Sequence, residues 1–403
     1  MCSIYGALGQ IDERAFAVLR AAARDRGRDG GGLRHYRLLD GRDAWLGNWR
    51  AAPTTEQPHV PPQPYEGVLH NGTIANDRAL GNEEGAVDSQ IIPKVIDRSS
   101  VKALADSLSH LQGSYALAVL SRGTVYLATN YKPLCYYDDG ACVYFSSMER
   151  HLKGIIPFGR RPSKLTPYSV LDLTTHEEIA LPRRLSRKAL VIASAGLDST
   201  VAAWKLKADG YAVTLLHFLY GCRAERREQE RIKAIAEALG ADCVFVPLDY
   251  RAYAGRSPLL NTEDTIAGGL TGAEFAYEWV PARNLLMIAH AVAYAEAHGF
   301  GVVALGNNLE ESGSYPDNEE EFTTLLDGVL DYAVGNGVEV RLRAPVGNLM
   351  KHEIAALGVA LGAPLHLTWS CYSGGEQHCG QCGPCFMRRE AFSRQGLTDP
   401  VFN

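Results

Sequence analysis

Four of the nine cysteines lie within fifteen residues near the C-terminus, with the spacing C-x7-C-x2-C-x2-C. They are Cys371, Cys379, Cys382 and Cys385. Gly380 and Gly383 lie between the close pairs and permit the tight backbone turns that tetrahedral zinc coordination needs. A redox pair would use two of these cysteines and leave the other two unexplained. The spacing therefore predicts a structural zinc site, because four thiolates leave no open coordination position.

Ahead of these cysteines, from residue 188 onward, short apolar runs alternate with stretches of helical periodicity. Residues 189–193, 211–218, 243–249 and 301–306 are rich in β-branched and apolar side chains and predict buried strands. Between the second and third of these runs, residues 232–239 carry apolar side chains at helical spacing. Strands that alternate with helices predict a doubly wound parallel sheet, with its binding site at the carboxyl ends of the strands.

The segment SAGLDST directly follows the first of these predicted strands. It comprises Ser194, Ala195, Gly196, Leu197, Asp198, Ser199 and Thr200. Small residues let backbone N–H groups approach a phosphate, and the N-terminus of the following helix favours an anion. The segment lacks the G-K-[ST] ending of a Walker A loop. From spacing alone, a phosphate-binding loop and an ordinary strand–turn–helix corner are equally supported.

The same segment resembles the SGG-x-DS pyrophosphate loop of the PP-loop ATPases, with Ala195 at the second glycine position. The half-chain from residue 188 resembles one branch of them, the 7-cyano-7-deazaguanine synthase (QueC) family. Its matching segments, in family order, are VPARNLL (280–286), SGSYPDNEEEF (312–322), KHEIAALG (351–358), TWSCY (368–372), RREAF (388–392) and DP (399–400). The resemblance implies an adenine nucleotide alpha hydrolase-like fold, with ATP and Mg²⁺ at residues 194–200 beside a structural zinc.

The resemblance also implies a 7-deazaguanine small molecule as the substrate. Arg283 would neutralise phosphate charge, and Glu311 and Asp317 lie in the segment that would recognise the base. One segment departs from the family pattern Y-G-Q-[RK]-H, because residues 220–224 are YGCRA and place Cys222 and Ala224 where the family has glutamine and histidine.

At the other end of the chain, Cys2 follows the initiator methionine. Removal of that methionine would place an α-amine beside the thiol, and an amine of pKa near ~8 can activate the nucleophile. A buried cysteine in a first strand is the alternative, and position 2 by itself does not decide between them.

The neighbouring segments resemble the class II glutamine amidotransferase domain, an N-terminal-nucleophile fold with an αββα sandwich. They are RGRDGGG (26–32), NWR (48–50), HNGTIAND (70–77), VDSQII (87–92), LQGSYA (111–116) and residues 132–147. The resemblance implies that Cys2 attacks the glutamine amide and that Asn71 and Gly72 supply oxyanion donors. Arg50 and Asp88 would hold the α-carboxylate and α-amine of glutamine. Thr73 stands where the family usually has glutamate.

The domain organisation follows from these resemblances. We expect an amidotransferase-like domain at residues 2–155, a linker at 156–187 and a QueC-like domain at 188–403. A net charge of −6 argues against a surface that binds nucleic acid throughout, and no apolar run is long enough for a membrane span. The N-terminus lacks the pattern of a secretory signal, so the sequence predicts a cytoplasmic protein, for which a homodimer remains open.

Together, the two resemblances imply an ATP-dependent C–N ligase that adenylates a 7-deazaguanine carboxylate and amidates it with ammonia from glutamine. Two alternatives remain. Similar fusions make archaeosine-type amidines on tRNA, with phage relatives acting on DNA, and the basic residues between 183 and 188 give this mild support. QueC-like enzymes of CBASS and Qat anti-phage systems join a 7-deazaguanine acyl group to a protein N-terminus, and Thr73 and Cys222 suit that chemistry with a repurposed first domain.

Overall fold

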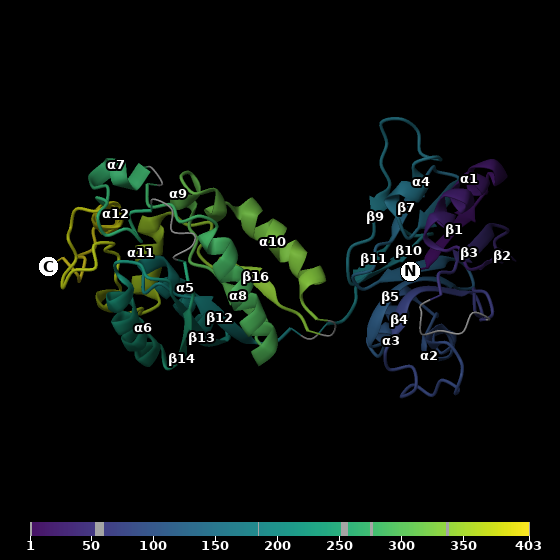
Figure 1. The fold of residues 1–403 in the computed structure, drawn as a ribbon, viewed down its shortest axis with the longest axis horizontal. Coiled ribbons are helices and arrows are strands. Elements are labelled where there is room, and N and C mark those ends of the chain that lie inside the picture. The colour runs from purple at the N-terminus through teal and green to yellow at the C-terminus, as the bar shows by residue number, and fades with distance from the viewer. Residues whose placement is uncertain are drawn as a thin grey trace. The chain divides into compact units, whose positions relative to one another are not determined.

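The computed structural model of the chain describes residues 2–52, 60–183, 185–250, 257–274, 277–335 and 338–402. The chain divides into two compact units, residues 1–183 and residues 184–403 (Figure 1). Each unit has its own hydrophobic clusters and its own sheets, and each is therefore described by itself.

The first unit consists of two antiparallel sheets with short helices. Its strands are β1 (Ser3–Gly9), β2 (Gly31–Arg37), β3 (Asp43–Trp49), β4 (Val68–Ile74), β5 (Gly113–Leu120), β6 (Val125–Thr129), β7 (Cys135–Asp138), β8 (Cys142–Ser146), β9 (Ser163–Lys164), β10 (Ser169–Asp172) and β11 (Glu178–Ala180). Its helices are α1 (Glu13–Ala23), α2 (Ile92–Val95), α3 (Val101–Leu108) and α4 (Glu149–Leu152). One sheet has the order β2-β3-β1-β8-β7-β9 and the other β11-β10-β6-β5-β4.

Strand periodicity explains why these sheets form a sandwich between helices. In β1, Ile4 and Leu8 belong to the cluster between the two sheets, whereas Tyr5 and Ala7 face a cluster that includes Phe16 of α1. Strand β5 behaves in the same way, and its outward side packs on residues of α3. Successive side chains of a strand point to opposite faces, so a strand that is apolar throughout must be covered on both faces. The expected αββα sandwich is confirmed.

The expected linker at residues 156–187 is largely part of this first unit. Strands β9, β10 and β11 lie within it, and β10 pairs with β6 while β9 pairs with β7. The strands of this segment are only two to four residues long and lie at or near sheet edges. Short strands of this kind give little periodic signal in a sequence.

The second unit has a parallel five-stranded sheet covered by helices. The strands are β12 (Lys188–Ile192), β13 (Ala212–Leu219), β14 (Asp242–Pro247), β15 (Val302–Ala304) and β16 (Arg341–Arg343), in the order β14-β13-β12-β15-β16. The helices are α5 (Leu197–Ala208), α6 (Glu225–Leu239), α7 (Gly269–Glu274), α8 (Arg283–His298), α9 (Leu309–Ser312), α10 (Glu320–Ala333), α11 (Lys351–Ala360) and α12 (Gly383–Arg394).

Both faces of this sheet are buried, which confirms the doubly wound prediction. Residues of α5 and α6 form one apolar cluster with the sheet, and residues of α8 and α10 form another on separate side chains of the same strands. The chain runs from β12 outward to β14 and then returns to β15 on the other side of β12. This reversal is the topological switch point, where open α/β sheets bind their ligands. Among the described residues, no helix combines the length and the apolar character that a membrane crossing requires.

Candidate active sites and metal centre

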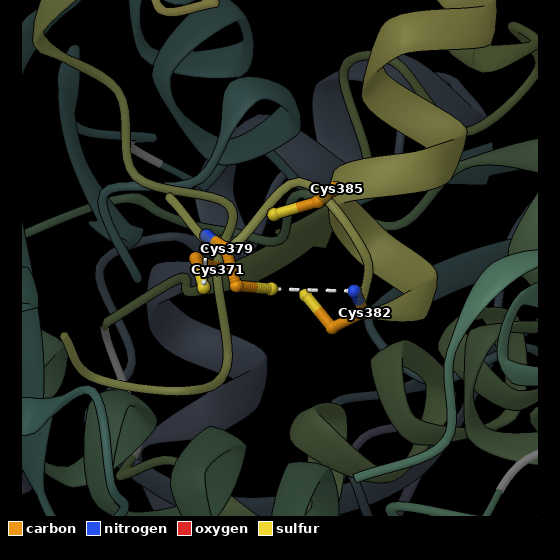
Figure 2. Close-up of side chains that lie close together, drawn as sticks. All are labelled: Cys371, Cys379, Cys382 and Cys385. Atoms are coloured by element: carbon orange, nitrogen blue, oxygen red, sulfur yellow. Dashed lines mark hydrogen bonds between the residues drawn. The ribbon is translucent and has the colours of Figure 1, made fainter. Parts of the chain in front are cut away.

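The four predicted zinc ligands converge in the second unit (Figure 2). The sulfur atoms of Cys371, Cys379, Cys382 and Cys385 all lie within 4.8 Å of one another. Tetrahedral Zn–S bonds of about 2.3 Å place sulfur atoms roughly 4 Å apart, so the cluster has the size of a zinc site. Backbone N–H groups of Ser373 and Cys379 donate to the Cys371 sulfur at 3.4 and 3.3 Å. Such donors stabilise thiolates, and the donor set fits a structural zinc.

A buried ion pair fixes helix α12, which contains Cys385 and is preceded directly by Cys382. Arg388 of α12 is almost fully buried and holds Asp399 with two hydrogen bonds of 2.8 and 2.9 Å. Its remaining N–H groups donate to the Thr368 hydroxyl and to the Leu365 carbonyl oxygen. The RREAF, DP and TWSCY segments therefore meet around one guanidinium, which ties the metal centre to the end of the sheet.

The predicted phosphate loop lies between β12 and α5, at the switch point of the sheet. Ala195 has a φ of +60°, a left-handed conformation that costs a residue with a Cβ about 1–2 kcal/mol. The N–H of Trp369 donates to the Ala195 carbonyl oxygen at 2.8 Å, which holds the loop in this conformation. Gly306, after β15, approaches closely, since a Cβ there would lie 2.7 Å from the Ser199 nitrogen. The loop thus forms a backbone cradle at the N-terminus of α5. In it the Ser194 N–H donates to Ser199 Oγ at 3.4 Å and the Gly196 N–H donates to Ser194 Oγ at 3.3 Å.

Three charged side chains form a row beside this loop, in which Lys351 is buried and Glu311 is 30% exposed. Lys351, at the start of α11, has a side chain only 8% exposed, and its Nζ lies 3.3 Å from Asp198 Oδ2 and 2.6 Å from Glu311 Oε1. Burial raises the pKa of Asp198 to about 6, while Lys351 opposes that rise. Lys351 keeps its charge, because the two carboxylates outweigh its own desolvation and raise its pKa. Asp198 Oδ1 is buried and has no hydrogen-bond partner.

Arg283 begins α8 on the other side of the same cavity. Its guanidinium donates to the Tyr220 hydroxyl at 3.4 Å and lies 6.0 Å from the centre of the Tyr220 ring. The preceding residue, Ala282, has a φ of +50° and is thus a second non-glycine residue in a left-handed conformation at this site. Strained residues of this kind concentrate at functional sites, where surrounding contacts hold them in place.

Two adjoining cavities result, of about 210 and about 30 Å³. The larger contains Ser194, Asp198, Ser199 and Lys351, and the smaller contains Asp317. The residues that line both are Arg283, Asn284, Glu311, Asn318 and Tyr372. Arg283, Glu311 and residues of the loop therefore line the larger cavity together. Asp317 lines the smaller cavity only.

The segment YGCRA, which departs from the family pattern, contributes Tyr220 to the lining of the larger cavity and does not contribute Cys222. Cys222 is buried, and its thiol donates to Glu228 Oε2 at 3.9 Å. The same carboxylate oxygen lies 3.9 Å from His217 Nε2. Glu228 lines the larger cavity, and its burial raises the pKa of that carboxyl to about 7. Sequence reasoning missed Glu228 and Lys351, although the spacing of α6 puts Glu228 one turn before the buried Ile232.

In the first unit, a separate cavity of about 250 Å³ brings together Cys2, Arg50, Asn71, Gly72 and Asp88. The Cys2 thiol is half-buried and donates to the Ala51 carbonyl oxygen at 3.7 Å. The Asn71 side chain, on β4, is 3% exposed, and its Nδ2 has no hydrogen-bond partner. The five predicted residues thus line one cavity, with an unpartnered amide donor among them. Met1, whose removal the proposed nucleophile requires, lies outside the described residues.

Other contacts shape this cavity. A Cβ at Gly72 would lie 1.9 Å from the Ser114 carbonyl oxygen, so the close pairing of β4 and β5 requires glycine there. The Asp88 carboxylate accepts a hydrogen bond of 2.6 Å from the Ile74 backbone N–H, which fixes its orientation. Thr73, at the position usually occupied by glutamate, also lines the cavity. Sequence reasoning missed Lys132 and His70, which line it too; burial lowers the pKa of His70, so its ring is neutral.

The two units define a class of protein: a doubly wound α/β unit with a cluster of four cysteines, joined to an αββα sandwich. The family model described as "Queuosine biosynthesis protein QueC" matches residues 188–396, and the model "Glutamine amidotransferase domain" matches residues 50–154. The chain belongs to the QueC family, and it carries a glutamine amidotransferase domain at its N-terminal end.

Full-length relatives share both units. A protein from Sulfurisphaera tokodaii named 7-cyano-7-deazaguanine synthase 2 is 39% identical over 100% of this chain and 99% of its own length. The 7-cyano-7-deazaguanine synthase of Sulfolobus acidocaldarius is 40% identical, with the same coverage of both chains. The synthase of Methanothrix thermoacetophila is 40% identical over 53% of this chain and 97% of its own length, so about half of this chain spans that whole relative. These relatives indicate that this protein is an enzyme.

Proposed function

We propose that the protein converts a 7-deazaguanine carboxylate into its amide and then its nitrile, using ATP and ammonia from glutamine. The observation that carries this proposal is the pair of adjoining cavities in the second unit. The larger one contains the loop residues Ser194, Asp198 and Ser199, and Arg283 lines both it and the smaller one. A nucleotide and a small acid could therefore lie end to end. The names of the full-length relatives support the same chemistry.

In the first unit, the Cys2 thiolate would attack the side-chain carbonyl carbon of glutamine. The carbonyl oxygen becomes an oxyanion, to which the unpartnered Asn71 Nδ2 and the Gly72 N–H are suited to donate hydrogen bonds. Collapse of this intermediate breaks the C–N bond, and the nitrogen leaves as ammonia once it has taken a proton. Water then hydrolyses the thioester and releases glutamate. Arg50 and Asp88 would hold the α-carboxylate and α-amine, and a guanidinium is suited to bidentate binding of a carboxylate.

In the second unit, a carboxylate oxygen of the substrate would attack the α-phosphorus of ATP and displace pyrophosphate. Ammonia then attacks the acyl carbon, loses a proton and displaces AMP, which gives the amide. A second adenylation, on the amide oxygen, followed by loss of AMP and protons, gives the nitrile. The backbone and the serine hydroxyls of the loop, together with Arg283 and Lys351, would supply the donors and cations that offset the phosphate charge in both steps.

Two metal ions belong to this proposal. Asp198 Oδ1 is a buried carboxylate oxygen without a partner beside the phosphate cradle, so Asp198 fits a ligand for Mg²⁺, which prefers oxygen donors. Mg²⁺ would neutralise charge on the triphosphate. The four clustered thiolates fit zinc, which would hold α12 against the TWSCY segment and take no part in the reaction.

The test is incubation of the full chain with 7-carboxy-7-deazaguanine, ATP, Mg²⁺ and either glutamine or ammonium. The expected products are AMP, pyrophosphate and a base whose mass corresponds to the amide or the nitrile. Absence of AMP release with both nitrogen sources would overturn the proposal.

A Cys2→Ala variant separates the two units in the same assay. It is expected to lose turnover with glutamine and keep turnover with ammonium, because only the thiol chemistry is removed. Cys135→Ala, in β7 and outside the cavity, is the matched control and should behave like the unchanged protein. If Cys2→Ala changes neither reaction, the first unit does not supply ammonia.

A further inference from the structure

Glu278 is a buried acidic residue that has no part in the predictions made from the sequence or in the proposed reaction. It directly precedes Trp279 and the VPARNLL segment, and the whole residue is 3% exposed. Its Oε1 atom has no hydrogen-bond partner. Burial raises the pKa of this carboxyl, and a hydrogen bond from its own backbone N–H opposes that rise. A buried carboxylate oxygen without a partner costs stability unless a ligand supplies donors.

The position of Glu278 along the cavity indicates which end of a ligand it would meet. Glu278 lines the smaller cavity only, whereas the loop residues Ser194 and Ser199 line the larger cavity only. Arg283 and Tyr372 line both and thus lie between them. A substrate whose carboxylate points to the phosphate cradle would therefore turn the opposite edge of its ring toward Glu278.

The cavity beside Glu278 has aromatic walls. Trp279 and Tyr315 are stacked with ring centroids 6.4 Å apart and ring planes inclined by 21°, and both line the smaller cavity together with Tyr372. Burial raises the pKa of Tyr315 to about 12, and the charge of Glu278 adds to that rise, so the phenol stays protonated beside the carboxylate. Aromatic side chains stack on any base, so this stack by itself does not select one ring over another.

Selection would come from the carboxylate. The edge of a guanine-type ring presents two adjacent N–H donors, N1–H and the 2-amino group, which a carboxylate can accept side by side. An adenine-type ring presents an acceptor at N1 instead, which would face the carboxylate with a lone pair. We propose that Glu278 is the residue that selects the guanine-type edge of the 7-deazaguanine substrate. This inference rests on the proposed function and adds a specificity-determining residue to it.

The experiment compares two ligands, 7-carboxy-7-deazaguanine and its analogue without the 2-amino group, by calorimetric binding to the full chain. One bidentate hydrogen-bonded contact discriminates by about 10- to 100-fold, and we expect that preference in the unchanged protein. In Glu278→Gln, the amide NH₂ group opposes one of the two donors, so the preference should fall below about threefold. Glu321→Gln, at an exposed position of α10, is the matched control and should keep the full preference.

Each outcome decides the inference. Equal binding of the two ligands by the unchanged protein, or an undiminished preference in Glu278→Gln, overturns it. If circular dichroism shows that Glu278→Gln does not fold, Glu278→Asp takes its place. That variant should bind the parent base at least about tenfold more weakly, with a smaller loss for the analogue; equal losses overturn the inference. Failure of the unchanged protein to bind or adenylate either base would instead sink the proposed function, so the two failures are distinguishable.

Discussion

Both cavities are proposed to bind negatively charged groups, but they are built differently. The first unit has neutral donors around a half-buried thiol, namely the unpartnered Asn71 Nδ2 and the backbone of β4, and single charged side chains of Arg50, Asp88 and Lys132 line the same cavity. The second unit has a network of charges, with the buried Lys351 between Asp198 and Glu311, and Arg283 lines the same cavity.

The difference follows from the ligands proposed for them. An oxyanion in amide hydrolysis carries one charge and exists only briefly, so a few fixed dipoles are sufficient to stabilise it. A triphosphate carries several charges throughout binding and needs cations of its own. Burying those cations requires buried carboxylates as partners, because an isolated buried charge is costly. The second unit therefore depends more on its charge network and its cysteine cluster. Variants of these residues should lose more stability and activity than variants in the first unit.

The largest effect is expected from loss of the metal. Cys385→Ala should release zinc and lower or abolish the unfolding transition of the second unit, since structural zinc contributes roughly 10 kcal/mol in small zinc domains. The transition of the first unit should stay in place, because the two units have separate cores. Differential scanning calorimetry with metal analysis measures both. Cys243→Ala, in β14 and outside the cluster, is the control, and an unchanged zinc content in Cys385→Ala would contradict the assignment.

Removing the charge of Lys351 tests the buried network. Lys351→Met leaves Asp198 and Glu311 without their shared cation, which we expect to cost about 3–5 kcal/mol of stability. ATP-dependent AMP release should fall about 100-fold or more with either nitrogen source, because the same cation is proposed to face the phosphates. Lys205→Met removes an exposed lysine that pairs with Asp209, and it should cost less than about 1 kcal/mol. Equal losses of stability in Lys351→Met and Lys205→Met would show that the Lys351 network contributes no more than an exposed ion pair.

Asn71→Ala tests the neutral donors of the first unit. Loss of one oxyanion donor lowers kcat by about 10²–10³, so turnover with glutamine should fall by that factor. Turnover with ammonium should stay the same, since the cavity of the second unit is untouched. Steady-state kinetics with the two nitrogen sources makes the comparison, and a parallel fall with ammonium would mean that Asn71 acts through folding.

A smaller effect is expected for Glu228, whose raised pKa makes the stability of the second unit depend on pH. Its pKa is about 7 in the folded chain against 4.5 as the ordinary value, chiefly because it is buried. Arg283 opposes this rise and Glu225 adds to it, with the Cys222 thiol and His217 close by. Between these pH values the folded state keeps a proton that the unfolded chain has lost. Stability of the second unit should therefore fall as pH rises from about 4.5 to about 7, by up to about 3 kcal/mol.

Glu228→Gln should reduce that slope by the contribution of Glu228, because an amide does not titrate in this range; Asp198, whose burial also raises its pKa, keeps its own contribution. Calorimetry at several pH values gives the slope for the transition of the second unit. Glu230→Gln, on the exposed side of α6, is the matched control and should leave the slope nearly unchanged. An equally steep slope in Glu228→Gln would show that another group titrates there.

Local patterns carried much of the prediction. The cysteine cluster and the predicted phosphate loop are short segments whose residue types and spacing specify their own geometry. The four sulfur atoms converge as predicted, and the loop follows β12 as predicted, while phosphate binding by the loop stays a prediction. The αββα sandwich and the doubly wound sheet were predicted from resemblance and from the alternation of strands with helices. The boundary between the units was placed too early, because β9, β10 and β11 are too short to give a periodic signal.

The two folds and the cysteine cluster could be predicted from the sequence alone. So could those cavity residues that belong to a recognisable short segment, such as Ser194–Thr200 and Asn71–Gly72. Only the tertiary structure decided that Lys351 lies between Asp198 and Glu311, and that Glu278 is buried with an unpartnered oxygen. The physical reason is that burial and charge pairing join residues far apart in the chain. Their energies depend on what surrounds a group in space, which the identity of its neighbours in sequence does not specify.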